Sequence, residues 1–229
     1  MKQDIKRFLQ ENSCQEKAQF DRGLIFSKYH IYGVKTSILD KKAKQLAKSD
    51  FEINDFSLDS HEGIILAGMT VGYSKLKDTE KIEKLSALLP YLDNWASVDT
   101  IAPRLKGLES QREYFENLLE EENVFAKRLG VVFLMKFFLK KDLTSVLDHI
   151  ERLAKNCREE NPTMEGEYYL QMALSWALAE ACTVNFDQAK KSVESISHVF
   201  IRNKAIQKAR ESFRLTREQK EMLKNMKLW

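Results

Sequence analysis

Apolar residues recur at helical spacing along almost the whole chain, whereas strand-like alternation is hard to find. Residues that interrupt helices are scarce, with only 3 Pro and 8 Gly among 229 positions. Ser, Thr, Asp or Asn residues that can cap a helix precede most of the periodic segments. A chain with this pattern buries its apolar stripes by packing helix against helix. The sequence therefore predicts an all-α fold.

The periodic segments predict roughly a dozen helices joined by short turns. Their expected ranges are 4–9, 13–29, 36–47, 60–73, 79–89, 94–103, 109–121, 123–139, 142–155, 165–183, 187–195, 202–213 and 216–226, with a stop and restart at 161–163.

Several neighbouring helix pairs repeat at a spacing close to that of HEAT-type repeats, roughly 30 to 45 residues. This spacing favours a HEAT-like solenoid of stacked antiparallel helix pairs. A compact helical bundle of irregular topology would have a similar sequence pattern. No segment is typical of a linker, so we expect a single domain spanning residues 1–229.

Composition excludes several classes of protein. Hydrophobic residues make up 43% and charged residues 31%, as in ordinary globular proteins. The three cysteines, Cys14, Cys157 and Cys182, are odd in number and widely spaced, which indicates a reducing, cytoplasmic location. No cluster of His and Cys has the spacing of a metal site, so no metal is expected. The N-terminus lacks a signal-peptide core, and the longest apolar run, 129–139, is too short to span a bilayer.

Positive charge is concentrated in the last quarter of the chain. Residues 186–229 contain 11 Lys/Arg and 5 Asp/Glu, or +6, which leaves −3 for the remainder of the net +3. In this quarter Arg202 is expected to begin a helix, with Lys204 and Lys208 one turn apart on one face. Cations beside the free N–H groups of a helix start would bind phosphate. The alternative is a solvated basic face.

Trp95 and Asp99 lie four residues apart in NWASVDTIAP, so one helical turn places them on the same face. An indole face can pack on a sugar ring, and a carboxylate can stabilise an adjacent oxocarbenium-like centre. This pairing indicates a catalytic site. The alternative makes Trp95 a core residue and Asp99 a solvated or capping acid.

Two further residues could belong to such a site. Arg128 follows Lys127 at the edge of an apolar stretch, where a guanidinium can bind phosphate or pair with the acids at 120–122. Trp176 lies in the middle of an apolar helix, where core packing is the alternative to a ligand contact. The glycine-rich nucleotide-binding motifs and the GxSxG motif of serine hydrolases are absent, so neither class of activity is supported.

Together these positions resemble the bacterial DNA alkylation repair enzymes of the HEAT-like type, the alkylpurine DNA glycosylases. The resemblance rests on YGVKTSILDKKAKQLAK, NWASVDTIAP, KRLGVVFLMKFFLK, YYLQMALSWALAEA and RNKAIQKARES, and it covers most of the chain, from Tyr32 to Ser212. The Trp-x-x-x-Asp spacing and the Tyr-Tyr…Trp-Ala-Leu segment are its most specific parts.

The resemblance implies a C-shaped helical solenoid whose concave face holds duplex DNA, alkylated or branched, as a monomer and without a cofactor. It implies hydrolysis of the N-glycosidic bond of N3- or N7-alkylated purines. Asp99 would be the catalytic aspartate, and Trp95 and Trp176 would flank the damaged nucleotide. Arg128 would contact the DNA backbone near the lesion.

Two features depart from the family pattern. Ungapped alignment on the glycine of YGVK places Leu24 where active members have a tyrosine beside the lesion, although Phe26, Tyr29 and Tyr32 are nearby. The positions 37–40 read Ser-Ile-Leu-Asp, where the family often has a proline followed by paired arginines.

Two alternatives to a glycosylase therefore stay open. One is an inactive relative that binds DNA structures, and the other is a solenoid scaffold that holds a peptide or protein. A DNA-binding protein should present its cations on one face. The residues expected there are Lys35, Lys127, Arg128, Arg202, Lys204 and Lys208.

Overall fold

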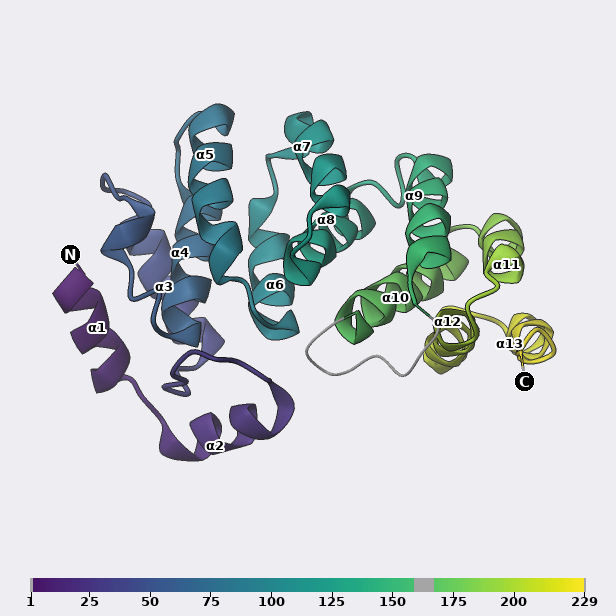
Figure 1. Cartoon of the computed structure of the whole chain (residues 1–229), viewed down its shortest axis with the longest axis horizontal. Coiled ribbons are helices and arrows are strands. Elements are labelled where there is room, and N and C mark those ends of the chain that lie inside the picture. The colour runs from purple at the N-terminus through teal and green to yellow at the C-terminus, as the bar shows by residue number, and fades with distance from the viewer. Residues whose placement is uncertain (1, 159–166, 229) are drawn as a thin grey trace. The chain divides into compact units, whose positions relative to one another are not determined.

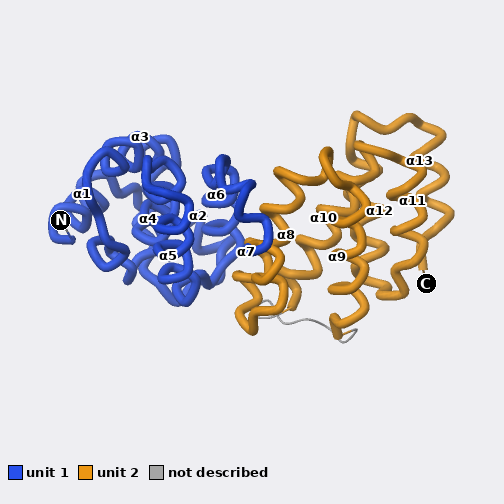
Figure 2. The backbone as a smooth tube through the Cα atoms, turned by 90° about the horizontal axis from the view of Figure 1, so that it is seen from above, with its two compact units in different colours: residues 1–114 blue, residues 115–229 orange. Residues whose placement is uncertain are grey.

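A computed structural model describes residues 2–158 and 167–228 of the chain (Figure 1). Within these residues every named element is a helix, and the one extended pairing is a single bridge between His30 and Ser60. The predicted all-α fold is therefore confirmed. The helices form two compact units, residues 1–114 and 115–229, and each is described by itself (Figure 2).

The central helix of the first unit is α4, in which every residue from His61 to Val71 is buried. It packs closely against α6, because a Cβ on Gly68 would lie only 2.6 Å from Cδ1 of Ile101. The elements of this unit are α1 (Lys2–Glu11), α2 (Gln15–Leu24), α3 (Thr36–Leu46), η1 (Ile53–Asp55), α4 (His61–Tyr73), α5 (Asp78–Leu88), η2 (Leu89–Tyr91), α6 (Trp95–Ile101), η3 (Ala102–Leu105) and η4 (Glu109–Gln111). The short α7 (Arg112–Asn117) crosses the boundary between the units.

The last six α-helices of the chain belong to the second unit and follow one another as three pairs. Its elements are η5 (Leu118–Glu120), α8 (Val124–Phe137), α9 (Leu143–Asn156), α10 (Tyr168–Val184), α11 (Phe186–Ser195), α12 (Val199–Glu211) and α13 (Arg217–Lys224). Helices α8 and α10 are buried on almost all sides, as expected for members of a stack that are covered by neighbours.

Side-chain contacts show that α8 and α10 run in the same direction. Contacts between α8 and α10 link Arg128 to Tyr169 near the helix starts and Lys136 to Trp176 one or two turns later. Tyr168 at the start of α10 likewise contacts Phe200 at the start of α12, with ring centroids 5.7 Å apart. Helices α8 and α10, which are separated by one helix in the chain, are thus aligned, as in a helical-repeat fold.

Several predicted helix ends are confirmed and others are wrong. Four predicted ranges begin at Ser60, Asn94, Asp142 and Thr216, and the side chains of these residues cap α4, α6, α9 and α13. The predicted helix 13–29 ends instead at Leu24. The predicted helix 109–121 is divided into η4, α7 and η5.

The other predictions about architecture have different outcomes. The predicted stop at 161–163 lies outside the described residues. The single domain, the HEAT-type repeat and the C shape stay predictions. Among the described residues, no helix combines the length and the apolar character that crossing a membrane requires.

Candidate functional site

Helix α6 carries both residues of the predicted catalytic pair. The Asn94 side chain begins this helix by accepting a hydrogen bond from the Ser97 backbone N–H at 3.0 Å. Trp95 and Asp99 follow one turn apart on the helix, and both are half-buried. Asp99 also makes at least one polar or electrostatic interaction. Neither residue is part of the fully buried core.

The indole ring of Trp95 is oriented by the end of α2. Its Nε1–H donates a hydrogen bond to the backbone carbonyl of Leu24, with 3.3 Å between the two atoms. The chain just after Leu24 is fixed to the same region, because one carboxylate oxygen of Asp93 accepts from Ser27 Oγ and from the Lys28 backbone N–H, each at 2.8 Å. Sequence analysis missed this connection, which joins residues about 70 positions apart.

The segment that holds Trp95 also exposes two large apolar side chains. Leu24 is 49% exposed and Phe26 is 53% exposed, which is unusual for residues of their size. Leu24 stands at the position where active alkylpurine DNA glycosylases, the family that the sequence resembles, have a tyrosine. This edge of α2 therefore presents apolar surface next to the indole of Trp95.

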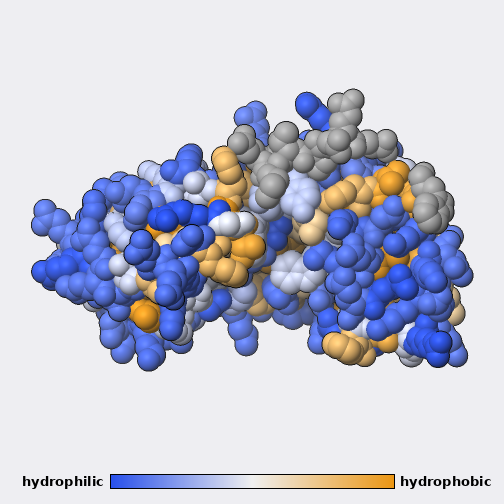
Figure 3. Space-filling model, turned by 90° about the horizontal axis from the view of Figure 1, so that it is seen from below, coloured by the Kyte–Doolittle hydropathy of each residue, from blue (hydrophilic) through white to orange (hydrophobic). Residues whose placement is uncertain are grey.

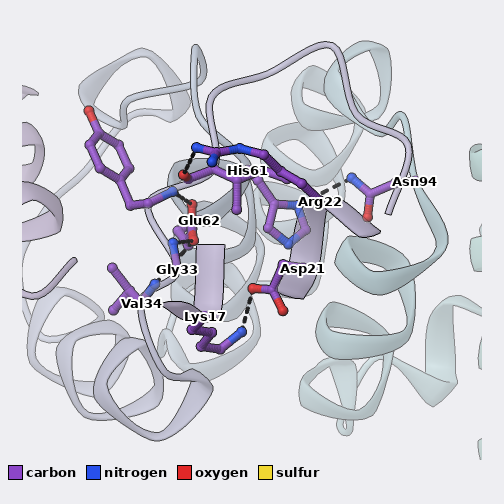
Figure 4. Close-up of polar contacts among 10 residues, drawn as sticks. Lys17, Asp21, Arg22, Gly33, Val34, His61, Glu62 and Asn94 are labelled. Carbon is purple, nitrogen blue, oxygen red and sulfur yellow. Dashed lines mark hydrogen bonds and ion pairs between the residues drawn. The ribbon is translucent and has the colours of Figure 1, made fainter. Parts of the chain in front are cut away.

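A partly buried polar cluster contains residues of α2, of the loop that follows it, of α4 and of the cap of α6. Figure 4 shows its residues Lys17, Asp21, Arg22, Gly33, Val34, His61, Glu62 and Asn94. The Glu62 carboxylate, which is 1% exposed, accepts hydrogen bonds from three consecutive backbone N–H groups, those of Tyr32, Gly33 and Val34, at 3.0, 2.6 and 3.1 Å. These bonds hold the loop between α2 and α3 against the start of α4.

Gly33 is required at the centre of this loop. Its φ angle is +75°, a left-handed conformation that side chains with a Cβ rarely adopt. A Cβ at this position would also lie 2.3 Å from the Cys14 carbonyl oxygen. The loop can therefore approach α2 only with glycine at this position.

His61 extends the polar cluster to the beginning of α6. The Asn94 amide donates to His61 Nδ1 at 3.2 Å, so the residue that caps α6 is itself held in place. Burial lowers the pKa of His61 below its usual value. A proton on Nδ1 would also remove the acceptor for Asn94. The neutral form of His61 is therefore the form that supports α6.

Lys35 is the third predicted site residue of the first unit. It occupies the N-cap position of α3, and its side chain is exposed. Helix α3 begins at Thr36, where the predicted range 36–47 begins. The side chain of Lys35 is accessible to an anionic ligand.

In the second unit, Arg128 is buried at 5% exposure on α8. Its Nη1 donates to the backbone carbonyl of Tyr169 on α10 at 2.5 Å, and the guanidinium makes further interactions. Glu120, one of the acids considered as its partner, forms an ion pair with Arg152. Lys127, the preceding residue, is half-buried. Arg128 thus fastens α8 to α10 from within the unit.

Trp176 lies on the accessible stripe of α10. Residues 168, 172, 176 and 180 are partly accessible at helical spacing, while most other residues of this helix are buried. The ammonium group of Lys136 lies 4.9 Å from the centroid of the Trp176 ring, within the range of a cation–π interaction. Trp176 therefore has an accessible part, in addition to the part that packs.

The predicted position of Arg202 at a helix start is wrong. Helix α12 begins at Val199 after a cap by His198, and the backbone N–H of Arg202 already donates to the His198 carbonyl. The guanidinium donates to the carbonyls of Met226 and Glu194 at 2.8 and 2.9 Å. Arg202 therefore ties α12 to neighbouring segments, and the predicted clamp of free N–H groups around it does not form.

Lys204 and Lys208 lie one turn apart on α12, as their spacing in the sequence predicts. Both side chains are half-buried. The Lys204 ammonium donates to Gln207 Oε1 at 3.1 Å and lies 6.0 Å from the ring centroid of Phe200. The two lysines thus share one side of α12.

The predicted site residues divide between the two units. The first unit contains Lys35, Trp95 and Asp99, and the second contains Lys127, Arg128, Trp176, Arg202, Lys204 and Lys208. Their meeting in one groove stays a prediction. Within residues 2–158 and 167–228, no group of three or more His, Cys, Asp or Glu side chains has the arrangement of a metal site.

Comparisons with known proteins identify the family. No curated protein and no solved structure gave a significant match to the chain. The family model described as DNA alkylation repair enzyme matches residues 5–217, which cover most of both units and include every predicted site residue. The chain therefore belongs to the DNA alkylation repair enzyme family, and this membership supports a role in DNA repair.

Proposed function

We propose that the protein binds duplex DNA and hydrolyses the N-glycosidic bond of N3- or N7-alkylated purines. The observation that carries this proposal is the pair formed by Trp95 and Asp99 on α6, both half-buried and one turn apart. The hydrogen bond from the Trp95 indole N–H to the Leu24 carbonyl orients the ring, and Asp99 follows Trp95 by one helical turn. Family membership supplies the substrate class, which is alkylated DNA.

The chemistry requires few groups. An alkylated N3 or N7 purine is already a cationic leaving group, so no general acid has to protonate it. Cleavage leaves positive charge on the deoxyribose, and the Asp99 carboxylate stabilises that charge and orients a water molecule. The ring face of Trp95 adds cation–π stabilisation. No metal or redox cofactor takes part in this proposal.

We propose that the more accessible cations hold the DNA backbone. Lys35 is exposed, and Lys127, Lys204 and Lys208 are half-buried, so their ammonium groups are available to phosphates. Arg128 and Arg202 donate to backbone carbonyls, so a smaller share of the phosphate contacts falls to them. Affinity for duplex DNA should decrease steeply with salt concentration, because phosphate contacts release counterions.

The test is release of 7-methylguanine from methylated duplex DNA. The wild type should release the base well above the spontaneous rate, and Asp99→Asn should reduce release at least about a hundredfold. Asp50→Asn, which removes an exposed carboxylate elsewhere in the first unit, is the matched control and should behave as wild type. Release by the wild type at only the spontaneous rate would contradict the proposal.

A second candidate function is favoured by Leu24. An exposed aliphatic side chain stands where active members of the resembling family have a tyrosine. A protein that binds DNA with steep salt dependence but releases no base would be an inactive DNA-binding relative. A protein that binds neither duplex nor branched DNA at low salt would instead be a scaffold for another protein.

A further inference from the structure

The turn between α12 and α13 presents one aromatic ring entirely to solvent. Phe213 is 101% exposed, the highest value among the exposed large hydrophobic residues of the described chain. The next apolar residue, Leu215, is buried at 7% and anchors the turn. The Arg214 N–H donates to Ser212 Oγ at 3.2 Å, and Thr216 forms a capping box at the start of α13. Phe213 is thus displayed on a turn whose flanking residues are fixed.

Lys and Arg residues are frequent in the sequence on both sides of Phe213. Residues 208–220 contain five Lys/Arg and two Asp/Glu, which gives a net charge of +3. The ammonium group of Lys220 on α13 lies 6.0 Å from the centroid of the Phe213 ring. Arg217 at the start of α13 is exposed. Arg210 and Arg214 are paired with Glu221 and Glu180, so the cations that remain beside the aromatic ring are Lys220 and Arg217.

The turn adjoins the accessible stripe of α10. The guanidinium of Arg214 donates to the Glu180 carboxylate on α10 at 2.7 Å. Glu180 follows Trp176 by one helical turn on the same stripe, about 6 Å along the helix axis. The turn that carries Phe213 is therefore tied through Arg214 to the helix face that carries Trp176, within the second unit.

We propose that this turn is a second DNA contact, in which Phe213 stacks on an unpaired base while the neighbouring cations hold the adjacent phosphates. A base offers a π-face to an exposed ring, and the backbone on either side offers negative charge, so the ligand matches both features of the surface. A single ring provides little apolar area for a membrane or a stable protein interface. The inference rests on the DNA-binding part of the proposed function and not on catalysis.

Binding of a labelled duplex with one extrahelical thymine, compared with the fully paired duplex, tests this proposal at low salt by fluorescence anisotropy. Phe213→Ala should weaken binding of the bulged duplex about 5- to 100-fold, and binding of the paired duplex less than about twofold. Phe213→Trp should retain the affinity. Met222→Ala, which removes another exposed apolar side chain from α13, is the matched control and should have no effect. Because Phe213 packs against little, none of these variants should lower the melting temperature appreciably.

The opposite results would overturn the proposal in distinct ways. Unchanged affinity of Phe213→Ala for the bulged duplex, or equal weakening on both duplexes, would exclude stacking on an unpaired base. Loss of binding to anionic phosphatidylglycerol vesicles with unchanged DNA binding would instead make the turn a membrane contact. If the wild type binds neither duplex, the proposed function fails together with this inference, whereas wild-type binding that ignores Phe213 refutes the inference alone.

Discussion

The two units each present a half-buried tryptophan, but they hold it by different means. Trp95 stands on the short helix α6, which depends on a side-chain cap, on His61 behind that cap, and on a hydrogen bond to Leu24. Trp176 stands on α10, a longer helix that is buried on nearly all sides by apolar contacts. The comparison indicates that the geometry around Asp99 depends on buried polar groups, whereas that around Trp176 depends on packing.

The largest effect should come from Glu62. Removing a buried carboxylate that accepts three backbone hydrogen bonds leaves three donors without a partner, so Glu62→Ala should lower the free energy of unfolding by about 3 kcal/mol or more. Urea denaturation of the full chain, followed by tryptophan fluorescence, measures this change. Gln171→Ala is the comparison in the second unit, where a buried amide donates to the Arg158 carbonyl, and it should cost less. An equal or larger loss for Gln171→Ala would contradict the contrast between the units.

The next effect should come from Gly33. Gly33→Ala introduces both an unfavourable backbone conformation and a clash with the Cys14 carbonyl, so it should destabilise the protein by about 2 kcal/mol or more. Gly107→Ala is the matched control, because Gly107 also has positive φ, but the space around it is open. It should cost about 1 kcal/mol. Thermal unfolding of the two variants would separate the cost of the backbone strain from the cost of the clash. Equal losses of stability would show that the close approach of Gly33 to α2 does not affect stability.

A smaller effect should appear on lowering the pH. The folded-state pKa of His61 is lowered by burial, so below about pH 6.5 the unfolded chain binds a proton that the folded chain does not. This contribution to stability is present above that pH and decreases as the pH falls through the folded-state pKa, by at most about 1.4 kcal/mol per pH unit. His61→Gln should remove this part of the pH dependence between pH 6.5 and 5, as measured by urea denaturation at each pH. An unchanged slope in that variant would show that other groups cause it.

Local features of the chain were predictable from the sequence. Capping residues such as Asn94 and Thr216 act on N–H groups two or three residues away, so their role is visible in the sequence itself. The spacing of Trp95 and Asp99 on one face of a helix is local in the same sense.

Contacts between distant segments were not predictable. The second helix ends at Leu24, and residues just beyond it bond to Asp93, 65 and 66 positions away. The start of α12 was missed because its cap is a histidine, whose Nδ1 accepts from the Ile201 N–H at 3.4 Å, and histidine is not among the usual capping residues. The hydrogen bonds of Glu62 were also not predicted, because its carboxylate and the N–H groups that donate to it lie about 30 residues apart in the sequence.

The most direct test of the account separates chemistry from binding across the two units. Single-turnover release of 7-methylguanine at saturating protein, together with the Kd for the same duplex, is measured for Asp99→Asn and for the double variant Lys204→Ala/Lys208→Ala. We expect Asp99→Asn to lower the rate at least about a hundredfold with nearly unchanged Kd. The lysine variant should raise the Kd and leave the saturated rate unchanged. Release by Asp99→Asn within about tenfold of the wild-type rate would contradict the role proposed for α6.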